Sequence, residues 1–175
     1  MGISGLLYNG YKYFMDNLIK KLEEINFENM LLSYKNIENL CQFTNYGNSL
    51  QCGVQYRPNE DIWNSANGTQ TKDENDCILL NPLFKDTFFE QVINKYRLKK
   101  SRLMKIPGKS CYSMHKDNSP RLHIPLVTNP ECYFVFKSGV VAHLEEGYIY
   151  WVDTTKMHTF INCSILDRLH FVAVI

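Results

Sequence analysis

The sequence predicts a mainly β domain with flanking helices, in which two sheets pack face to face as a jelly roll. From Arg102 onward, about eight short apolar runs follow one another, separated by turn residues such as Pro107-Gly108 and Glu146-Gly147. Short strands at this spacing are typical of a sandwich or a double-sheet jelly roll. The aromatic content, 11 Tyr and 10 Phe, favours a sheet-rich fold with an aromatic-lined cavity. The predicted strands are Arg102–Ile106, Cys111–His115, Arg121–Val127, Cys132–Phe136, Val140–Leu144, Tyr148–Val152, His158–Asn162 and Arg168–Ile175.

Two segments among the first hundred residues have the apolar spacing of amphipathic helices. Over residues 11–25, apolar side chains recur at intervals of three and four, and the opposite face carries charged side chains that we interpret as solvated surface. A second helical pattern runs from Phe84 to Tyr96. Because the chain has no repeat and no linker, we expect both helices to buttress the jelly roll.

Between these helices the sequence predicts one strand, Leu50–Tyr56, and then a polar loop, Arg57–Asp76, rich in Asn, Asp, Gly and Thr. In an enzyme a loop of this length is often a lid; a variable surface loop is the alternative. A chain of 175 residues is most simply one domain. We therefore expect a single domain over residues 1–175, with residues 1–100 as a helical and loop buttress and residues 101–175 as the jelly-roll core.

The charge balance excludes some classes of partner. With 19 basic and 18 acidic side chains, the net charge is near zero, so nothing indicates bulk electrostatic capture of nucleic acid or of an anionic membrane. No apolar run is long enough to span a bilayer. The N-terminus lacks the basic-then-apolar layout of a secretion signal. These features predict a cytoplasmic protein.

The six cysteines are scattered and include no Cys-x-x-Cys pair. A disulfide framework is possible on their number alone, but without a signal peptide we expect buried, reduced thiols. A cysteine zinc site is not expected, because such sites have closely spaced ligand pairs. The cysteines are Cys41, Cys52, Cys77, Cys111, Cys132 and Cys163.

The stretch His115-Lys116-Asp117, followed by the distant His158, has the form of a 2-His-1-carboxylate triad. Such a triad occupies one face of an octahedral Fe(II) and leaves the other face open for a cosubstrate and dioxygen. Arg168, ten positions after His158, supplies a fixed cation for an acidic cosubstrate. The arrangement predicts the metal, the kind of cosubstrate and the class of reaction together.

Alternation along strands places these polar side chains on shared faces, because every second residue of a barrel strand points inward. A sequence shaped by burial alone would not align chargeable groups on single faces of apolar strands without partners for them. The aligned sets are His115 and Asp117; Arg121 and His123; His158, Phe160 and Asn162; and Arg168, His170, Val172 and Val174.

The distal histidine ligand has four candidates, and a lone strand histidine is usually structural. His158 is favoured because it begins an apolar strand and stands ten residues before Arg168. His143 is predicted to be peripheral, in a hairpin strand. His123 lies too soon after the His-x-Asp pair, and is better placed to contact cosubstrate or substrate. His170 is the fourth. Further candidate pocket residues, each at least as easily explained by packing, are Tyr112, Trp151 and Asn162.

From about Arg102 to the C-terminus, the chain resembles the aspartyl/asparaginyl β-hydroxylase family of Fe(II)/2-oxoglutarate oxygenases. The resemblance implies a double-stranded β-helix, the cupin-type jelly roll, with iron at its open end. It does not extend to the first hundred residues. The segments that carry it are Pro107-Gly108, Tyr112 to Asp117, Arg121 to Leu126, Glu146-Gly147, Asp153-Thr154, His158 to Asn162 and Arg168 to His170.

The resemblance also implies roles for single residues. His115, Asp117 and His158 would bind Fe(II), and Arg168 would pair with the distal carboxylate of 2-oxoglutarate, since a planar guanidinium matches a carboxylate. The Arg121-x-His123 element resembles the family's second basic element, near the cosubstrate or the substrate carboxylate. Dioxygen would complete the cofactor set.

The reaction implied is hydroxylation of an unactivated C–H bond, with succinate and CO2 as coproducts. Because some members carry Gly where this chain has Asp117, the full triad is closer to members that act on free amino acids, such as the cis-proline hydroxylases, than to the endoplasmic-reticulum peptide hydroxylase. An amino acid or a peptide is the expected substrate. The alternatives are a cupin-type dioxygenase that does not use 2-oxoglutarate, and a metal-binding barrel without activity.

Overall fold

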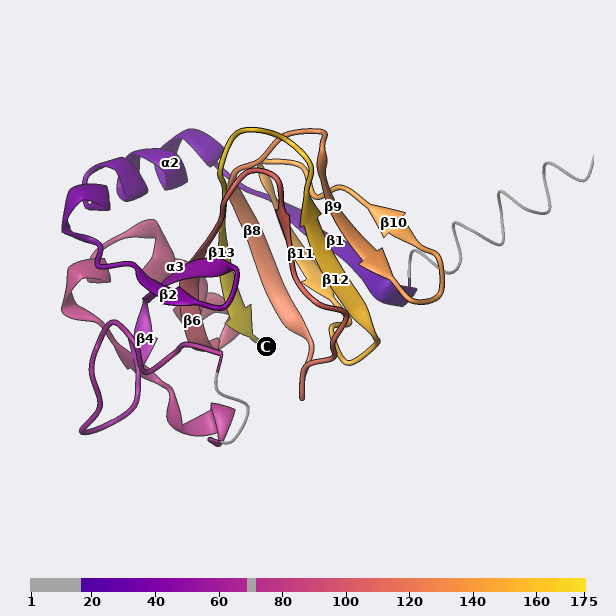
Figure 1. Ribbon diagram of the computed structural model, residues 1–175. Helices are drawn as coiled ribbons and strands as arrows, with labels where there is room; N and C mark the ends of the chain where they lie inside the picture. Colours follow the sequence, from indigo (N-terminus) through magenta and orange to yellow (C-terminus); the bar gives the residue numbers. More distant parts are fainter. Residues whose placement is uncertain (1–16, 69–71) are drawn as a thin grey trace, which may run out of the picture.

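Figure 1 shows the computed structural model of the protein, which describes residues 17–68 and 72–175. In that part of the chain, a 7-stranded sheet has the order β1-β11-β8-β13-β6-β3-β2, and a 4-stranded sheet has the order β10-β9-β12-β7. The strands of the larger sheet are β1 (Ile19–Glu24), β2 (Thr44–Tyr46), β3 (Ser49–Gly53), β6 (Lys99–Ile106), β8 (Arg121–Val127), β11 (Tyr148–Val152) and β13 (Arg168–Val174). Those of the smaller sheet are β7 (Ser110–Cys111), β9 (Cys132–Phe136), β10 (Val141–Ala142) and β12 (His158–Asn162).

The chain from β6 onward passes back and forth between the two sheets. β6, β8, β11 and β13 lie in the larger sheet, while β7, β9, β10 and β12 lie in the smaller one, and every pairing is antiparallel. This is a double-stranded β-helix, so the predicted fold is confirmed. The predicted bounds of β8, β9, β11 and β12 agree with the structure residue for residue.

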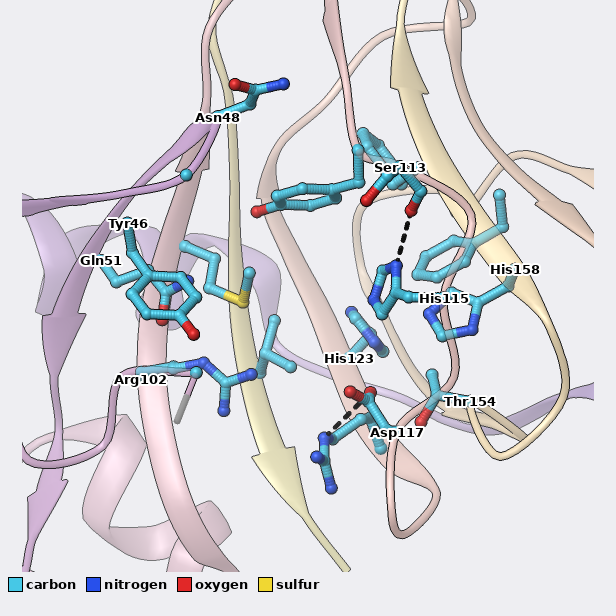
Figure 2. Close-up of a pocket in the computed structure, with 18 of the residues that line it drawn as sticks. Tyr46, Asn48, Gln51, Arg102, Ser113, His115, Asp117, His123, Thr154 and His158 are labelled. Atoms are coloured by element: carbon cyan, nitrogen blue, oxygen red, sulfur yellow. Dashed lines mark hydrogen bonds and ion pairs between the residues drawn. The ribbon is translucent and has the colours of Figure 1, made fainter. Parts of the chain in front are cut away.

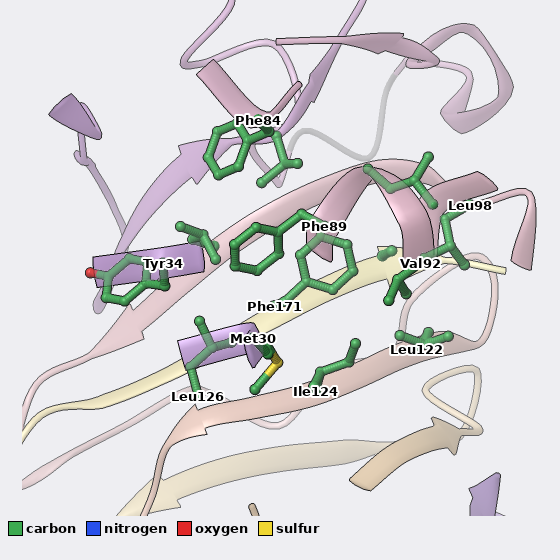
Figure 3. Packing of buried hydrophobic residues seen from close by; sticks show 14 of the residues in the cluster. Met30, Tyr34, Phe84, Phe89, Val92, Leu98, Leu122, Ile124, Leu126 and Phe171 are labelled. Carbon is green, nitrogen blue, oxygen red and sulfur yellow. The ribbon is translucent and has the colours of Figure 1, made fainter. Parts of the chain in front are cut away.

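Two helices cover the outer face of the larger sheet. They are α2 (Phe27–Lys35) and α3 (Phe88–Tyr96), and both lie on the same side of the sheet in Figure 1. Buried side chains of the helices pack against outward-facing residues of β8 and β13 (Figure 3). Among them, Phe89 lies between Phe84, which it meets edge to face, and Phe171, with 5.6 Å between ring centroids on each side.

The predicted helix from Phe84 to Tyr96 is confirmed over most of its length. It begins at Phe88 instead, because Pro82–Phe84 forms a separate 3₁₀ turn. It ends where Arg97 takes a left-handed conformation with φ of 52°, a common way to close a helix.

The amphipathic helix predicted over residues 11–25 is wrong for residues 19–24, which form β1; residues 11–16 lie outside the described part. β1 pairs with β11 along the edge of the larger sheet. The ladder satisfies the backbone and buries Leu18 and Ile19, while Leu22, which the helical pattern would bury, is 40% exposed. Tertiary pairing overrides the local periodicity here, as it often does.

The remaining elements are short. The predicted strand 50–56 is present as β3 and β4 (Gln55–Tyr56), and β4 pairs with β5 (Leu79–Leu80). Of residues 57–76, the described ones are turns and coil until a 3₁₀ helix at Glu74–Asp76. Another 3₁₀ helix covers Glu38–Leu40.

The six cysteines form no disulfide, and three of them, Cys52, Cys77 and Cys132, are buried, whereas Cys111 and Cys163 are exposed. No helix of the described part is long and apolar enough to cross a membrane.

Strand alternation sorts the side chains of the larger sheet into two environments. On β8, Leu122 and Ile124 point out to the helices, so Arg121 and His123 point in. On β13, Phe171 belongs to the outer cluster, while residues 168, 170 and 172 face the space between the sheets. The outer face under the helices is therefore mainly apolar, and the inner face carries the chargeable groups of the cavity.

Candidate functional site

A cavity of about 650 Å³ lies between the two sheets. Its walls include every site residue that the sequence predicted: His115, Asp117, Arg121, His123, His158 and Arg168. Figure 2 shows His115, His158 and Asp117 on one side of it, and Arg102 with Gln51 on the other. The strand-alternation argument thus identified residues that converge on one space.

His115 and His158 are brought together by the backbone. Each donates its N–H to the carbonyl of the other, at 2.9 and 2.8 Å, so the segment after β7 is bridged to the start of β12. Their ring centroids are 4.5 Å apart. Sequence positions 43 residues apart therefore become direct neighbours through a single antiparallel bridge.

The two imidazoles are oriented as metal ligands usually are. Nδ1 of His115 bonds the carbonyl of Ser113 and Nδ1 of His158 bonds that of Lys156, each at 2.8 Å (Figure 2 shows the first). With Nδ1 as the donor, Nε2 carries the lone pair that binds a metal. Burial lowers the pKa of His158, which favours the neutral form that metal binding requires.

Asp117 reaches the same cavity by a separate contact. Its backbone N–H donates to the carbonyl of Thr154 at 2.8 Å, which ties it to the loop before β12. Its carboxylate Oδ2 lies 3.3 Å from Nε of Arg121, an ion pair drawn in Figure 2. As they stand, no three His, Cys, Asp or Glu side chains of residues 17–68 and 72–175 are close enough to hold a metal ion. Two imidazoles and one carboxylate lining the same cavity nevertheless have the donor chemistry that fits Fe(II).

Arg168 is the largest fully buried side chain described, at 2% exposure. Its Nη2 donates to Nδ1 of His170, and its guanidinium carbon lies 3.9 Å from the centre of the Phe160 ring. Its Nε has no hydrogen-bond partner, and no carboxylate of the described residues pairs with it. Burial lowers its pKa to about 9, so it remains charged at neutral pH. A buried, unpaired cation in a cavity is a receptor for an anion.

His123 is a second incomplete group in this wall. It is 6% exposed, its ring meets Phe134 edge to face with 5.0 Å between centroids, and neither ring nitrogen has a partner. Burial first, and then the charge of Arg168, hold its pKa well below 6.5. A neutral imidazole with two open nitrogens is suited to a polar ligand in the cavity.

Arg121 differs from what the sequence suggested. Its guanidinium is engaged by Glu74, with Nη2 to Oε1 at 2.7 Å and Nη1 to Oε2 at 3.2 Å. Glu74 belongs to the 57–76 segment, which the sequence treated as a loop. Nothing local in the sequence links these residues, which are 47 positions apart.

Arg102, on β6, is the cavity residue that sequence reasoning missed. It is 6% exposed, its Nη1 donates to the carbonyl of Lys100 at 3.2 Å, and its Nε has no partner. Met104, two residues on, lines the same cavity. The alternation rule, applied to the predicted strand 102–106, would have found both.

The other four candidates fall into two groups according to whether they line the cavity. Tyr112 lines the cavity, whereas Trp151, His143 and Asn162 do not. Trp151 packs under Lys20, with 5.1 Å from Nζ to the ring centre, and Nδ1 of His143 bonds the carbonyl of Cys132. Asn162 is fully buried and its amide donates to three backbone carbonyls. These three are structural residues.

Comparison with known proteins gives a family. The family model described as Aspartyl/Asparaginyl beta-hydroxylase matches residues 38–175, which extends well before Arg102, where the sequence resemblance began. No curated protein matches the chain in sequence.

Solved structures share the fold at low identity. A 2OG-Fe(II) oxygenase family oxidoreductase from Burkholderia pseudomallei is 10% identical with a TM-score of 0.59, covering 96% of this chain and 88% of its own. A prolyl hydroxylase from Trichoplax adhaerens, in complex with a hypoxia inducible factor peptide, is 11% identical with a TM-score of 0.57 over 99% and 93%. HygX from Streptomyces hygroscopicus, with nickel, 2-oxoglutarate and hygromycin B bound, is 11% identical with a TM-score of 0.53 over 94% and 86%.

Proposed function

The chain belongs to the aspartyl/asparaginyl β-hydroxylase family and is a 2-oxoglutarate/Fe(II) oxygenase, and from this premise we propose that it hydroxylates an unactivated C–H bond of an amino acid or of an aspartyl or asparaginyl residue in a peptide. The substrate C–H, 2-oxoglutarate and O2 are converted to the C–OH product, succinate and CO2. When bound, iron and 2-oxoglutarate supply the oxidising chemistry, and the protein positions the reactants and excludes side reactions.

His115, Asp117 and His158 would hold the iron. The Nδ1 bonds of the two imidazoles to backbone carbonyls fix which nitrogen each presents, and this is the observation that carries the proposal. His143 makes a similar bond outside the cavity, so the argument depends on the pair: two rings with centroids 4.5 Å apart, lining one cavity, each with Nε2 left for a metal. Asp117 would supply the anionic ligand of the 2-His-1-carboxylate set that is typical of non-haem Fe(II) sites.

Arg168 would receive the distal carboxylate of 2-oxoglutarate. The two imidazoles nearest to it on the inner face are neutral, because the pKa of His123 and that of His170 are both held well below 6.5 by burial and by Arg168 itself. Two neutral imidazoles beside one guanidinium leave a single positive charge, which matches a single carboxylate. His123 is the neighbouring group able to hydrogen-bond the same ligand.

Arg102 would receive an acidic group of the substrate. It lies across the cavity from His115 and His158 (Figure 2) and has no carboxylate partner among the described residues. Since a buried, unpaired charge is costly, its retention supports a substrate that carries a carboxylate, such as an amino acid or an aspartyl residue. Gln51 on the same wall could add an amide contact.

The first experiment is spectroscopic. Anaerobic addition of Fe(II) and 2-oxoglutarate to the purified protein is expected to produce the visible charge-transfer band of a chelated 2-oxoacid. His158→Ala should abolish the band and turnover while the protein stays folded by circular dichroism, and His143→Ala, outside the cavity, is the matched control. Full activity of His158→Ala would contradict the ligand assignment, and turnover without 2-oxoglutarate would contradict the proposed reaction.

A further inference from the structure

Glu74 lies at the centre of a buried cluster with Lys100, Arg121 and Ser119, beside the proposed metal ligands. It is 8% exposed, and its carboxylate accepts from both Nη atoms of Arg121, from Nζ of Lys100 at 3.0 Å, and from the hydroxyl of Ser119. A buried carboxylate needs such partners, because removing an ionised group from water is costly. The cluster thus joins the 57–76 segment to β6 and β8.

The backbone is shaped to complete this cluster. Lys100 has φ of +50°, which a non-glycine residue adopts only at a cost. The register of β13 on β6 shifts between Val172 and Val174, so that two residues of β6 oppose one of β13. Such a bulge re-aims a side chain, and here the Lys100 ammonium is buried against Glu74. Strained backbone that builds a contact is often found next to functional sites.

Arg121 stands between Glu74 and Asp117. Both Nη atoms of Arg121 donate hydrogen bonds to the Glu74 carboxylate. Nε of Arg121 lies 3.3 Å from Oδ2 of Asp117. The Asp117 contact is an ion pair without the alignment of a hydrogen bond, so it restrains the carboxylate while leaving its other oxygen open. Three of the five guanidinium N–H groups are therefore already taken by Glu74 and Ser119 before an anion enters the cavity.

We propose that Glu74 is a positioning residue for the metal site: it fixes Arg121 so that Arg121 holds the Asp117 carboxylate toward His115 and His158, and it withdraws Arg121 from cosubstrate and substrate binding. The inference rests on the proposed metal ligands. The family resemblance implies that Arg121 lies near the cosubstrate or the substrate carboxylate. In this proposal Arg121 instead supports the metal ligand Asp117. The anion receptors of the cavity are then Arg168 and Arg102.

Metal affinity tests this inference without requiring turnover. Binding of Co(II) to the chelator-treated protein would be measured by calorimetry for the unaltered chain, Glu74→Gln, Arg121→Gln and the double variant. Loss of a group that orients a metal ligand typically costs about 10- to 100-fold in affinity, and this is expected for each single change. Because both act through one path, the double variant should bind no more weakly than Arg121→Gln.

Lys100→Met is the matched control, since it removes another partner of Glu74 but leaves Arg121 and Asp117 in place. Its Co(II) affinity should fall far less than that of Glu74→Gln, because both contacts of Glu74 with Arg121 remain. At saturating Ni(II), the affinity for 2-oxoglutarate should be no weaker with Glu74→Gln than without it, since Arg121 is then released toward the cavity, whereas general loosening of the cavity would weaken it.

The outcomes are distinct. Unchanged Co(II) affinity in folded Glu74→Gln, or losses that add in the double variant, would overturn the positioning role. Failure of the unaltered chain to bind Co(II) would instead overturn the proposed function. If Glu74→Gln does not fold, Arg121→Lys replaces it: the change retains the charge but loses the planar fork, and normal Co(II) affinity in that variant would overturn the inference.

Discussion

Three arginines point into one cavity, yet their surroundings give them different chemistry. Arg121 meets two carboxylates, those of Glu74 and Asp117, whereas Arg168 and Arg102 meet none among the described residues. A buried charge is stabilised by a partner and destabilised without one. The two unpaired arginines are therefore the ones suited to bind anionic ligands, and the paired one is suited to hold the site in shape.

Truncation of Arg168 should weaken the use of cosubstrate specifically. Loss of one side of a buried, charge-assisted contact costs about 2 kcal/mol or more, which is at least roughly 30-fold. Arg168→Ala is therefore expected to raise the KM for 2-oxoglutarate by at least that factor, with little change in Fe(II) affinity. Arg102→Ala is the matched comparison, and it should leave this KM nearly unchanged while it raises the KM for the acidic substrate. Steady-state assays of succinate formation would measure both, and equal effects of the two changes would show that the anchors are wrongly assigned.

At the scale of elements, each strand of the larger sheet has one face for stability and one for function. The outer face packs on α2 and α3 mainly through apolar side chains, with an exposed ion pair between Lys95 and Glu23 at the β1 edge, and the inner face carries the ionisable groups of the cavity. Because successive side chains of a strand point to opposite faces, the two sets occupy the same strands without mixing. Changes in the outer layer should then affect folding more than chemistry.

Phe89 in α3 tests this separation. It is fully buried and its ring meets those of Phe84 and Phe171. Removal of a core phenylalanine side chain typically costs about 3–5 kcal/mol, because a cavity is left behind. Phe89→Ala is expected to lower the free energy of unfolding by about this amount in urea titrations, with metal affinity of the folded protein unchanged. A large loss of metal affinity at full folding would show that the two faces are coupled.

At the scale of the whole molecule, Glu74 should make stability depend on acid pH. Burial by itself would raise the pKa of Glu74, but hydrogen bonds from Arg121 and Ser119 lower it from 4.5 to about 2. A carboxyl with a lowered folded-state pKa adds stability that is complete above its ordinary pKa and is lost as the pH falls toward the folded-state value. The contribution is on the order of 3 kcal/mol.

The free energy of unfolding should therefore fall as the pH drops from about 5 to about 2, and part of this loss should be absent in Glu74→Gln. Urea titrations of both proteins across that range would measure it. The difference in stability between the two proteins is expected to shrink as the pH falls. A difference that stays constant would show that the Glu74 carboxylate is not the group responsible.

The sequence by itself determined the jelly roll, the inward faces of its strands and the convergence of the His-x-Asp pair, the distal histidine and Arg168. These follow from alternation and spacing, which are local properties of a chain: four strands were bounded correctly, and all six predicted site residues line one cavity. The tertiary structure alone decided that residues 19–24 form an edge strand, because pairing with β11 outweighs a helical periodicity.

The tertiary structure also decided the partner of Arg121. Glu74 lies 47 positions away in a stretch that resembles a surface loop, and a strand bulge at Lys100 completes its surroundings. The pairing of two buried charges depends on which segments fold against each other. Strand periodicity can show that an arginine points inward, but only packing determines which carboxylate meets it there.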